Sequence, residues 1–130
     1  MKNILRISAI FGALLLGACN TSVQVDSQAN PVANYNSCSG IFTGSIRGSV
    51  PTVFNAARLA LSNDMHYYVN GEITKNPNAM KLRARTISDD KVIITITPDP
   101  KDPAISQVEI DVDGLINGQK IFNAIARQAR

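Results

Sequence analysis

The chain has 130 residues, of which 45% are hydrophobic, and its 13 basic and 10 acidic side chains give a formal charge of +3. This length suits one domain with an apolar core. Two of the basic residues, Lys2 and Arg6, lie in an N-terminal segment that we expect to be removed, which leaves 11 basic against 10 acidic side chains. Nucleic-acid binding depends on a clear excess of basic charge, so we expect no nucleic-acid partner.

The N-terminal segment has the three parts of a secretory signal. A basic start, Lys2 to Arg6, precedes the apolar run Ile7 to Leu16, and small residues lead up to Cys19. The run is shorter than the roughly 20 residues that a membrane-spanning helix needs. The sequence therefore predicts a signal peptide over residues 1–18, with a plain secretory signal or an uncut short membrane anchor as the alternatives.

The end of this segment, Leu16-Gly17-Ala18-Cys19, resembles the lipobox of bacterial lipoproteins. The resemblance implies cleavage before Cys19, diacylglycerol on its sulfur and a further acyl chain, such as palmitate, on the new amino terminus. Two or more chains anchor a protein firmly. Asn20, and not Asp, follows the cysteine, which in enteric-type lipoproteins favours the outer membrane. We expect a lipid-anchored outer-membrane protein that faces either the periplasm or the exterior.

The next segment, Asn20 to Ser37, is polar and has no sustained apolar period. We expect residues 19–38 to be the lipidated cysteine and a flexible tether, with a single domain over residues 39–130. If Cys19 is acylated, Cys38 has no partner within the chain. A lone thiol in an oxidising compartment is then tolerated, paired with another molecule or redox-active.

The domain itself begins with a strand pattern at residues 41–47, followed by a helix pattern at residues 50–62 that has Ser49 as a suitable N-cap. Four further stretches alternate between apolar and polar residues as strands do. Gly71 marks a bulge in the first of them, or Asn70-Gly71 is a hairpin turn. These strands are expected over residues 65–74, 80–87, 92–97 and 105–113, and a last helix over residues 117–128.

Two apolar helix stripes and one apolar sheet face fit together as a two-layer α+β domain. Because the strands alternate cleanly, we expect an antiparallel sheet with two helices packed on one face, in the order β-α-β-β-β-β-α.

Two segments of this pattern support a resemblance to a known group of proteins. The stretch from Gly48 to Leu61 and the helix residues Ile121 to Ile125 resemble small bacterial lipoproteins of unknown function, and more narrowly the virulence-associated lipoproteins of Francisella. The resemblance implies a role in envelope biology, virulence or host interaction. It implies no reaction, because the matching residues are packing residues.

The sequence offers little for catalysis. His66 is the one histidine, and no Gly-x-Ser-x-Gly nucleophile motif accompanies it. No second His or Cys stands at metal-ligand spacing. We therefore expect no enzyme activity, no metal and no cofactor.

Charged residues alternate along two of the predicted strands and should project from the open face of the sheet. They form a candidate docking face for a polar partner, although a soluble, self-attracting surface explains them as well. The basic members are Lys81, Arg83 and Arg85, and the acidic members are Glu109, Asp111 and Asp113.

The covered face of the sheet offers a second candidate site. Helices over a curved sheet can enclose an apolar cavity, although interiors are usually filled. The expected lining consists of Phe54, Met65, Tyr67, Leu82, Ile94 and Phe122.

The leading functional hypothesis is a membrane-anchored envelope lipoprotein that presents a small, non-catalytic interaction domain to a protein partner in the envelope or in a host. The alternative is a carrier of an apolar ligand or lipid, held between the helices and the sheet.

Overall fold

The computed structural model describes residues 19–76 and 78–130. The predicted signal peptide over residues 1–18 lies outside this range. Across the described part of the chain, no helix is both long enough and apolar enough to cross a bilayer.

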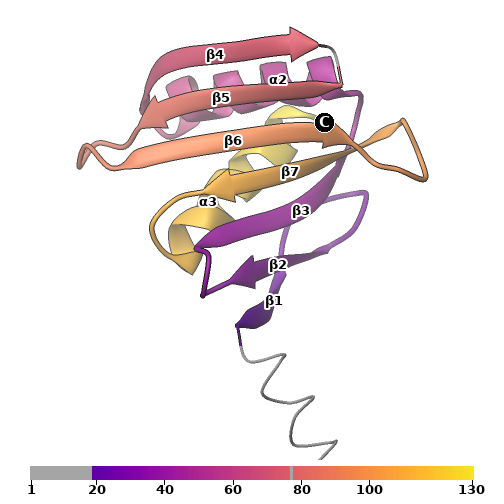
Figure 1. Ribbon diagram of the computed structural model, residues 1–130, viewed down its shortest axis with the longest axis horizontal. Helices are drawn as coiled ribbons and strands as arrows, with labels where there is room; N and C mark the ends of the chain where they lie inside the picture. The colour runs from indigo at the N-terminus through magenta and orange to yellow at the C-terminus, as the bar shows by residue number, and fades with distance from the viewer. Residues whose placement is uncertain (1–18, 77) are drawn as a thin grey trace, which may run out of the picture.

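One antiparallel sheet of seven strands runs through the described domain (Figure 1). Their order across the sheet is β1-β2-β3-β7-β6-β5-β4. Short connections keep β4 to β7 side by side in chain order, and β7 then pairs with β3 in the middle of the sheet. The strands are β1 (Asn20–Gln24), β2 (Val32–Asn36), β3 (Ile41–Arg47), β4 (Tyr68–Asn76), β5 (Ala79–Arg85), β6 (Lys91–Pro98) and β7 (Ile105–Asp111).

Helices α2 (Val50–Leu59) and α3 (Leu115–Gln128) both cover the same face of the sheet (Figure 1). Helix α2 packs against β5 and β6, helix α3 packs against β3 and β7, and the two helices contact each other. The structure therefore confirms the predicted two-layer α+β fold with both helices on one face.

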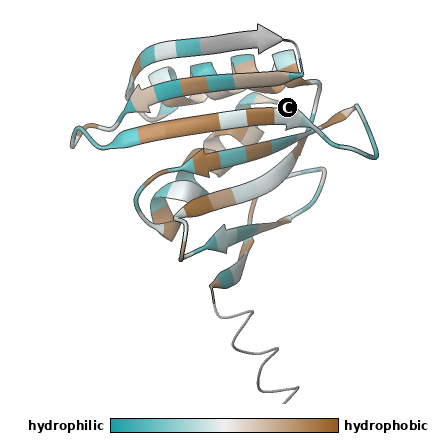
Figure 2. Ribbon diagram, viewed as in Figure 1, coloured by the Kyte–Doolittle hydropathy of each residue, from teal (hydrophilic) through white to brown (hydrophobic). Residues whose placement is uncertain are grey.

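Alternation along each strand decides which face the helices cover. In β6, Val92, Ile94 and Ile96 are fully buried, while Lys91 and Ile93 point to the other side. Burial of each aliphatic side chain contributes about 1.5–3 kcal/mol. An apolar–polar alternation is visible along β5 and β7 in Figure 2. This leaves one face of the sheet without a covering layer.

The expected flexible tether is wrong, because residues 20–37 form strands β1 and β2 and the turns beside them. Val23 and Ala33 are cross-strand partners, and both are buried in the core. On the other face, Asn34 Nδ2 donates to Asn20 Oδ1 at 3.2 Å. Each strand contributes so few buried residues that its apolar period is too short to recognise. The two strands are held in the sheet by the pairing of β2 with β3, which a local sequence pattern does not reveal.

The region between α2 and β4 also differs from the prediction. Helix α2 ends at Leu59 and continues as a π-helical turn, η1 (Ala60–Asp64), and β4 begins at Tyr68 instead of residue 65. His66, in the connection, has a positive φ of 57°, which ends the helical path. The predicted bulge at Gly71 is confirmed by the register shift after Val69, so the alternative of a hairpin turn is wrong.

Candidate functional site

The uncovered face of the sheet carries the basic residues of the predicted docking face on β5. Lys81, Arg83 and Arg85 point away from the helices, and Arg83 and Arg85 are exposed. Leu82 and Ala84, which alternate with them, are buried against the helices. The two-residue period of the strand thus separates its charged side chains from its packing side chains.

The acidic residues follow the same rule on β7. Glu109 and Asp111 are exposed on the uncovered face, whereas Val108 and Ile110 are fully buried. Asp113 departs from the prediction, because β7 ends at Asp111 and Asp113 lies in the connection to α3. The structure therefore brings Glu109 and Asp111 onto the sheet ladder but leaves Asp113 beyond it.

The pairing of β5 with β6 and of β6 with β7 arranges the basic and acidic residues in rows across the face. Two rows share a base on β5, an uncharged residue on β6 and an acid on β7: Arg83, Ile93 and Asp111 in one row, and Lys81, Thr95 and Glu109 in the next. The base and the acid of each row are two strand spacings apart, roughly 10 Å. The face is therefore basic on one side of β6 and acidic on the other.

These charges do not neutralise one another by contact. Among the side chains that the structure describes, the ion pairs within 4.0 Å are Arg58 with Glu72 and Arg127 with Asp26, and both lie off this face. Arg85 Nη1 donates to the backbone carbonyl of Asp89, an uncharged acceptor, at 3.2 Å. The charged groups of the face are thus available to an incoming partner.

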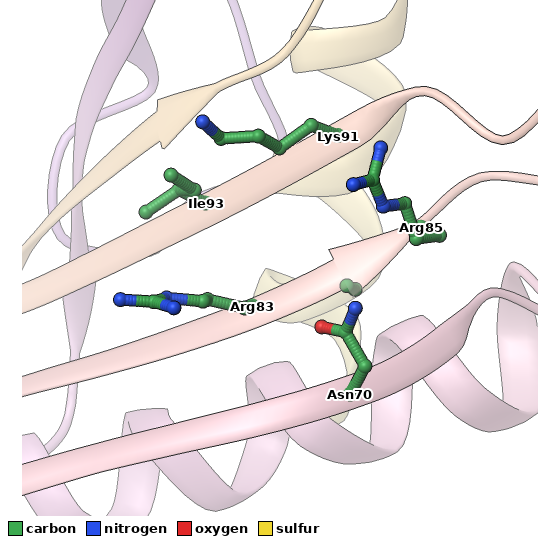
Figure 3. Close-up of a pocket in the computed structure, with 6 residues that line it drawn as sticks. Asn70, Arg83, Arg85, Lys91 and Ile93 are labelled. Atoms are coloured by element: carbon green, nitrogen blue, oxygen red, sulfur yellow. The ribbon is translucent and has the colours of Figure 1, made fainter.

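A hollow of about 360 Å³ opens on the basic side of this face (Figure 3). Three cationic side chains surround it, and the Asn70 amide points toward β5 from the β4 bulge. Its lining residues are Asn70, Arg83, Ala84, Arg85, Lys91 and Ile93.

A second hollow, of about 210 Å³, lies on the same face between the basic and acidic sides. Its lining includes all three residues of the second row, Lys81, Thr95 and Glu109, together with Asp111. The apolar side chains of Ile41 and Ile93 complete its wall. This hollow can accept a side chain that carries both polar and apolar atoms.

Two polar residues of the first hollow, Asn70 and Lys91, were not among the predicted site residues. Asn70 reaches this face because the bulge changes the register of β4 between Val69 and Gly71. The Asn-Gly pair was a recognisable signal for that bulge. Lys91 pairs directly with Arg85 across the β5–β6 hairpin, a contact that follows from the tight turn once the register is known.

The predicted cavity-lining residues occupy the core instead. Phe54, Leu82, Ile94 and Phe122 are at most 7% exposed and belong to one packed cluster. Met65 and Tyr67 pack against that cluster from its edge, and burial raises the pKa of the Tyr67 hydroxyl. None of these six residues lines either hollow on the open face. The apolar-carrier alternative thus gains no support from the described residues.

The cysteines differ from the expectation that Cys38 is unpaired. In the structure, Cys19 and Cys38 form a disulfide, with their Cα atoms 5.5 Å apart. They meet because β1 and β2 pair, which sets Asn20 opposite Asn36. A sulfur in a disulfide cannot also form a thioether to diacylglycerol. Lipidation of Cys19 and the disulfide are therefore mutually exclusive states of this chain.

The described residues hold no group of three or more His, Cys, Asp and Glu side chains that could bind a metal ion. His66 was expected on a strand, but it lies exposed in the η1–β4 connection. Comparison of the chain with models of known protein families and with curated proteins finds no match. The open face, with its rows of charged residues and its two hollows, is the most developed candidate site among the described residues.

Proposed function

We propose that this chain is a lipid-anchored envelope protein that binds a protein partner through the open face of its sheet and catalyses no reaction. The observation that carries the binding role is the pair of rows with a base on β5 and an acid on β7. Complementary charge fixes the orientation of a partner more than it adds affinity. A partner with acids opposite β5 and bases opposite β7 would dock in one orientation.

The lipobox resemblance at Cys19 supports the membrane anchor. Because β1 begins at Asn20, immediately after this cysteine, a lipidated chain would hold the β1 edge of its sheet against the bilayer surface. No flexible spacer would lie between the anchor and the domain, since Asn20 is already the first residue of β1. The open face would then stand beside the membrane, with β1 near the lipid and β4 far from it.

The location of the partner follows from the same proposal. The resemblance to virulence-associated lipoproteins supports a partner in the bacterial envelope or on a host surface. Either partner would bind the open face of the sheet, because helices α2 and α3 cover the opposite face.

Photo-crosslinking in living cells tests the docking role. A photoreactive residue replaces Arg83 or Glu109, one on each side of the face, and a matched control replaces Ile116, which is 64% exposed on α3. We expect both positions on the open face to capture the same protein and the control position to capture none. Absence of a defined product from both positions, or equal capture at position 116, would contradict the proposal.

Metabolic labelling with an alkyne fatty acid tests the anchor. We expect the wild-type chain and Cys38→Ser to incorporate the label and partition into membranes, and Cys19→Ser to do neither. Cys38→Ser is the matched control, because it removes the disulfide without removing the proposed lipid site. An unlabelled wild-type chain would refute the lipid anchor. The docking role would then be tested by the crosslinking result, independently of the anchor.

A further inference from the structure

We propose that the hollow on the basic side of the open face is a binding site for the phosphate group of a small phosphate monoester. The inference goes beyond the proposed function, because it assigns a small ligand to one end of the proposed docking face, where the ligand and a protein partner would compete. It assigns a ligand chemistry to residues that the docking proposal alone leaves as a general charged surface.

The hydrogen-bonded register of the sheet gathers three cations around this hollow. Arg83 and Arg85 stand two residues apart on one side of β5, and Lys91 on β6 is the direct cross-strand partner of Arg85. Like charges placed directly opposite each other destabilise a sheet. A bound anion would relieve this repulsion, which gives the arrangement a reason to attract one.

The acidic groups near the hollow leave its cations largely uncompensated. Asp89 and Asp90 lie in the β5–β6 turn. Arg85 donates a hydrogen bond to the backbone carbonyl of Asp89, which carries no charge. Asp111 lies across β6 from Arg83, with Ile93 between them. No carboxylate among the described residues comes within 4.0 Å of these three cations.

The chemistry of the lining favours phosphate over other anions. Guanidinium groups donate two parallel hydrogen bonds to phosphate oxygens, and Lys91 adds a compact positive charge. The amide of Asn70 supplies a neutral donor from the neighbouring strand (Figure 3). Three oxygens of a monoester can therefore be matched from three strands at once.

The volume of the hollow exceeds what a phosphate ion needs. About 360 Å³ falls at the lower end of the range for small-molecule sites. The side chain of Ile93 gives its wall an apolar portion that cannot satisfy polar atoms. The ligand should therefore carry a small uncharged body of sugar or glycerol size beside its phosphate.

The position of the hollow in the sheet bears on the source of the phosphate. Strand β6 is four strand spacings from β1, where the proposed anchor is attached, a distance of roughly 19 Å. Head groups of the anchoring leaflet would meet the β1 edge first. A soluble phosphate monoester is thus the favoured ligand over a membrane phospholipid.

Isothermal titration of the full chain in a neutral detergent tests the site. The titrants are glycerol 3-phosphate, short-chain phosphatidylglycerol below its micelle concentration, and glycerol as the uncharged control. We expect glycerol 3-phosphate to bind at 150 mM salt and glycerol not to bind. Tighter binding of the phospholipid, which is a phosphate diester, or binding of neither phosphate compound would overturn the proposal.

Charge-removing variants separate a built site from general attraction. We expect Arg83→Gln and Arg85→Gln each to weaken Kd by about tenfold or more, since each removes charge-assisted hydrogen bonds. Lys81→Gln is the matched control, because it removes the same charge from the same strand face but lines the other hollow. It should leave Kd within about a factor of three, because Lys81 lines the other hollow and would make no hydrogen bond to the ligand.

An equal loss of affinity in Lys81→Gln and Arg83→Gln would show diffuse attraction and overturn the assignment. Unchanged thermal unfolding of all three variants confirms that they fold. The result is independent of the docking test, because crosslinking at position 109 uses the acidic side of the face and requires no phosphate.

Discussion

Gly44 on β3 lies directly against the ring of Phe122 on α3. A Cβ atom added to Gly44 would fall 2.5 Å from Phe122 Cε2, a separation that real side chains do not adopt. The missing side chain allows α3 to pack down onto the sheet, where Phe122 also meets the ring of Phe42 with centroids 5.6 Å apart. The close approach of α3 to the sheet depends on this contact.

The first prediction follows from that contact. Gly44→Ala should lower the free energy of unfolding by about 1–3 kcal/mol, because the buried ring has to move to admit the methyl group. Denaturant unfolding of the purified chain measures the loss.

Gly71→Ala is the matched control for this substitution. Gly71 also lies in a strand, but an added Cβ would meet only Arg83 atoms at 3.8 Å, an ordinary contact. Its free energy of unfolding should change by less than about 0.5 kcal/mol. Equal effects of the two substitutions would mean that strand glycines in general, and not the Phe122 contact, determine the loss.

The second prediction tests the N-terminal hairpin. Val23→Asp places a charge where the native side chain is 7% exposed, so we expect a loss of about 3 kcal/mol in unfolding free energy. Ser22→Asp adds the same charge to the other face of β1, where the side chain is exposed. It should change stability by less than about 0.5 kcal/mol. If β1 were a tether, the two variants would behave alike.

The contrast between β6 and β1 explains how far the sequence predicts this fold. Residues of β6 such as Val92, Ile94 and Ile96 repeat an apolar period long enough to identify a strand and its buried face. In β1, Val23 stands alone as a buried residue, and nothing local distinguishes the strand from a polar linker. Such an edge strand is defined by its neighbour, a long-range interaction that a local pattern does not contain.

The candidate site, like the fold, is predicted only in part by the local sequence pattern. The alternation of Arg83 and Arg85 with buried residues predicts their common face from sequence alone. That Lys91 stands beside Arg85, and that Asn70 joins them, depends on the hairpin register and on the β4 bulge. A period of two residues identifies the face of a strand, but the partner across the sheet has to be known to define a hollow.

The third prediction concerns the pH dependence of stability at Asp99. The backbone N–H of Lys101 and the side-chain amide of Gln107 donate to its two carboxylate oxygens, each at 2.8 Å, and lower its pKa below the ordinary 3.8. Because the pKa is lower in the folded state, these bonds stabilise the fold above the ordinary pKa. Their contribution is lost as the pH falls through the lowered value.

Gln107→Ala should therefore raise the pKa of Asp99 toward 3.8, which carboxyl NMR titration measures directly. The unfolding midpoints of the wild type and this variant should differ at neutral pH and converge in acid. Gln119→Ala is the control, since Gln119 donates to the carbonyl of Gln24 and has no contact with Asp99. A pKa of Asp99 that is unchanged in Gln107→Ala would contradict the prediction.

The last prediction uses the competition for the sulfur of Cys19. Cys38 is exposed and 19 residues from Cys19 in the chain, so a thiol reagent can reach it. A free Cys38 thiol indicates that Cys19 carries lipid, and a blocked one indicates the disulfide. We expect the detergent-soluble, lipidated fraction from native membranes to react with maleimide without reduction. The unlipidated fraction should react only after reduction, and reduction should lower its unfolding free energy by about 3 kcal/mol.

A non-reducing gel completes this test, because Cys38 of a lipidated chain can also pair with another molecule. Such chains would migrate as a larger species that disappears on reduction and regains maleimide reactivity. A monomeric fraction that carries lipid on Cys19 and still has no reactive thiol would contradict the exclusion. Pairing of β1 with β2 brings the two cysteines together, so lipid has to reach Cys19 before the disulfide forms or after it is reduced.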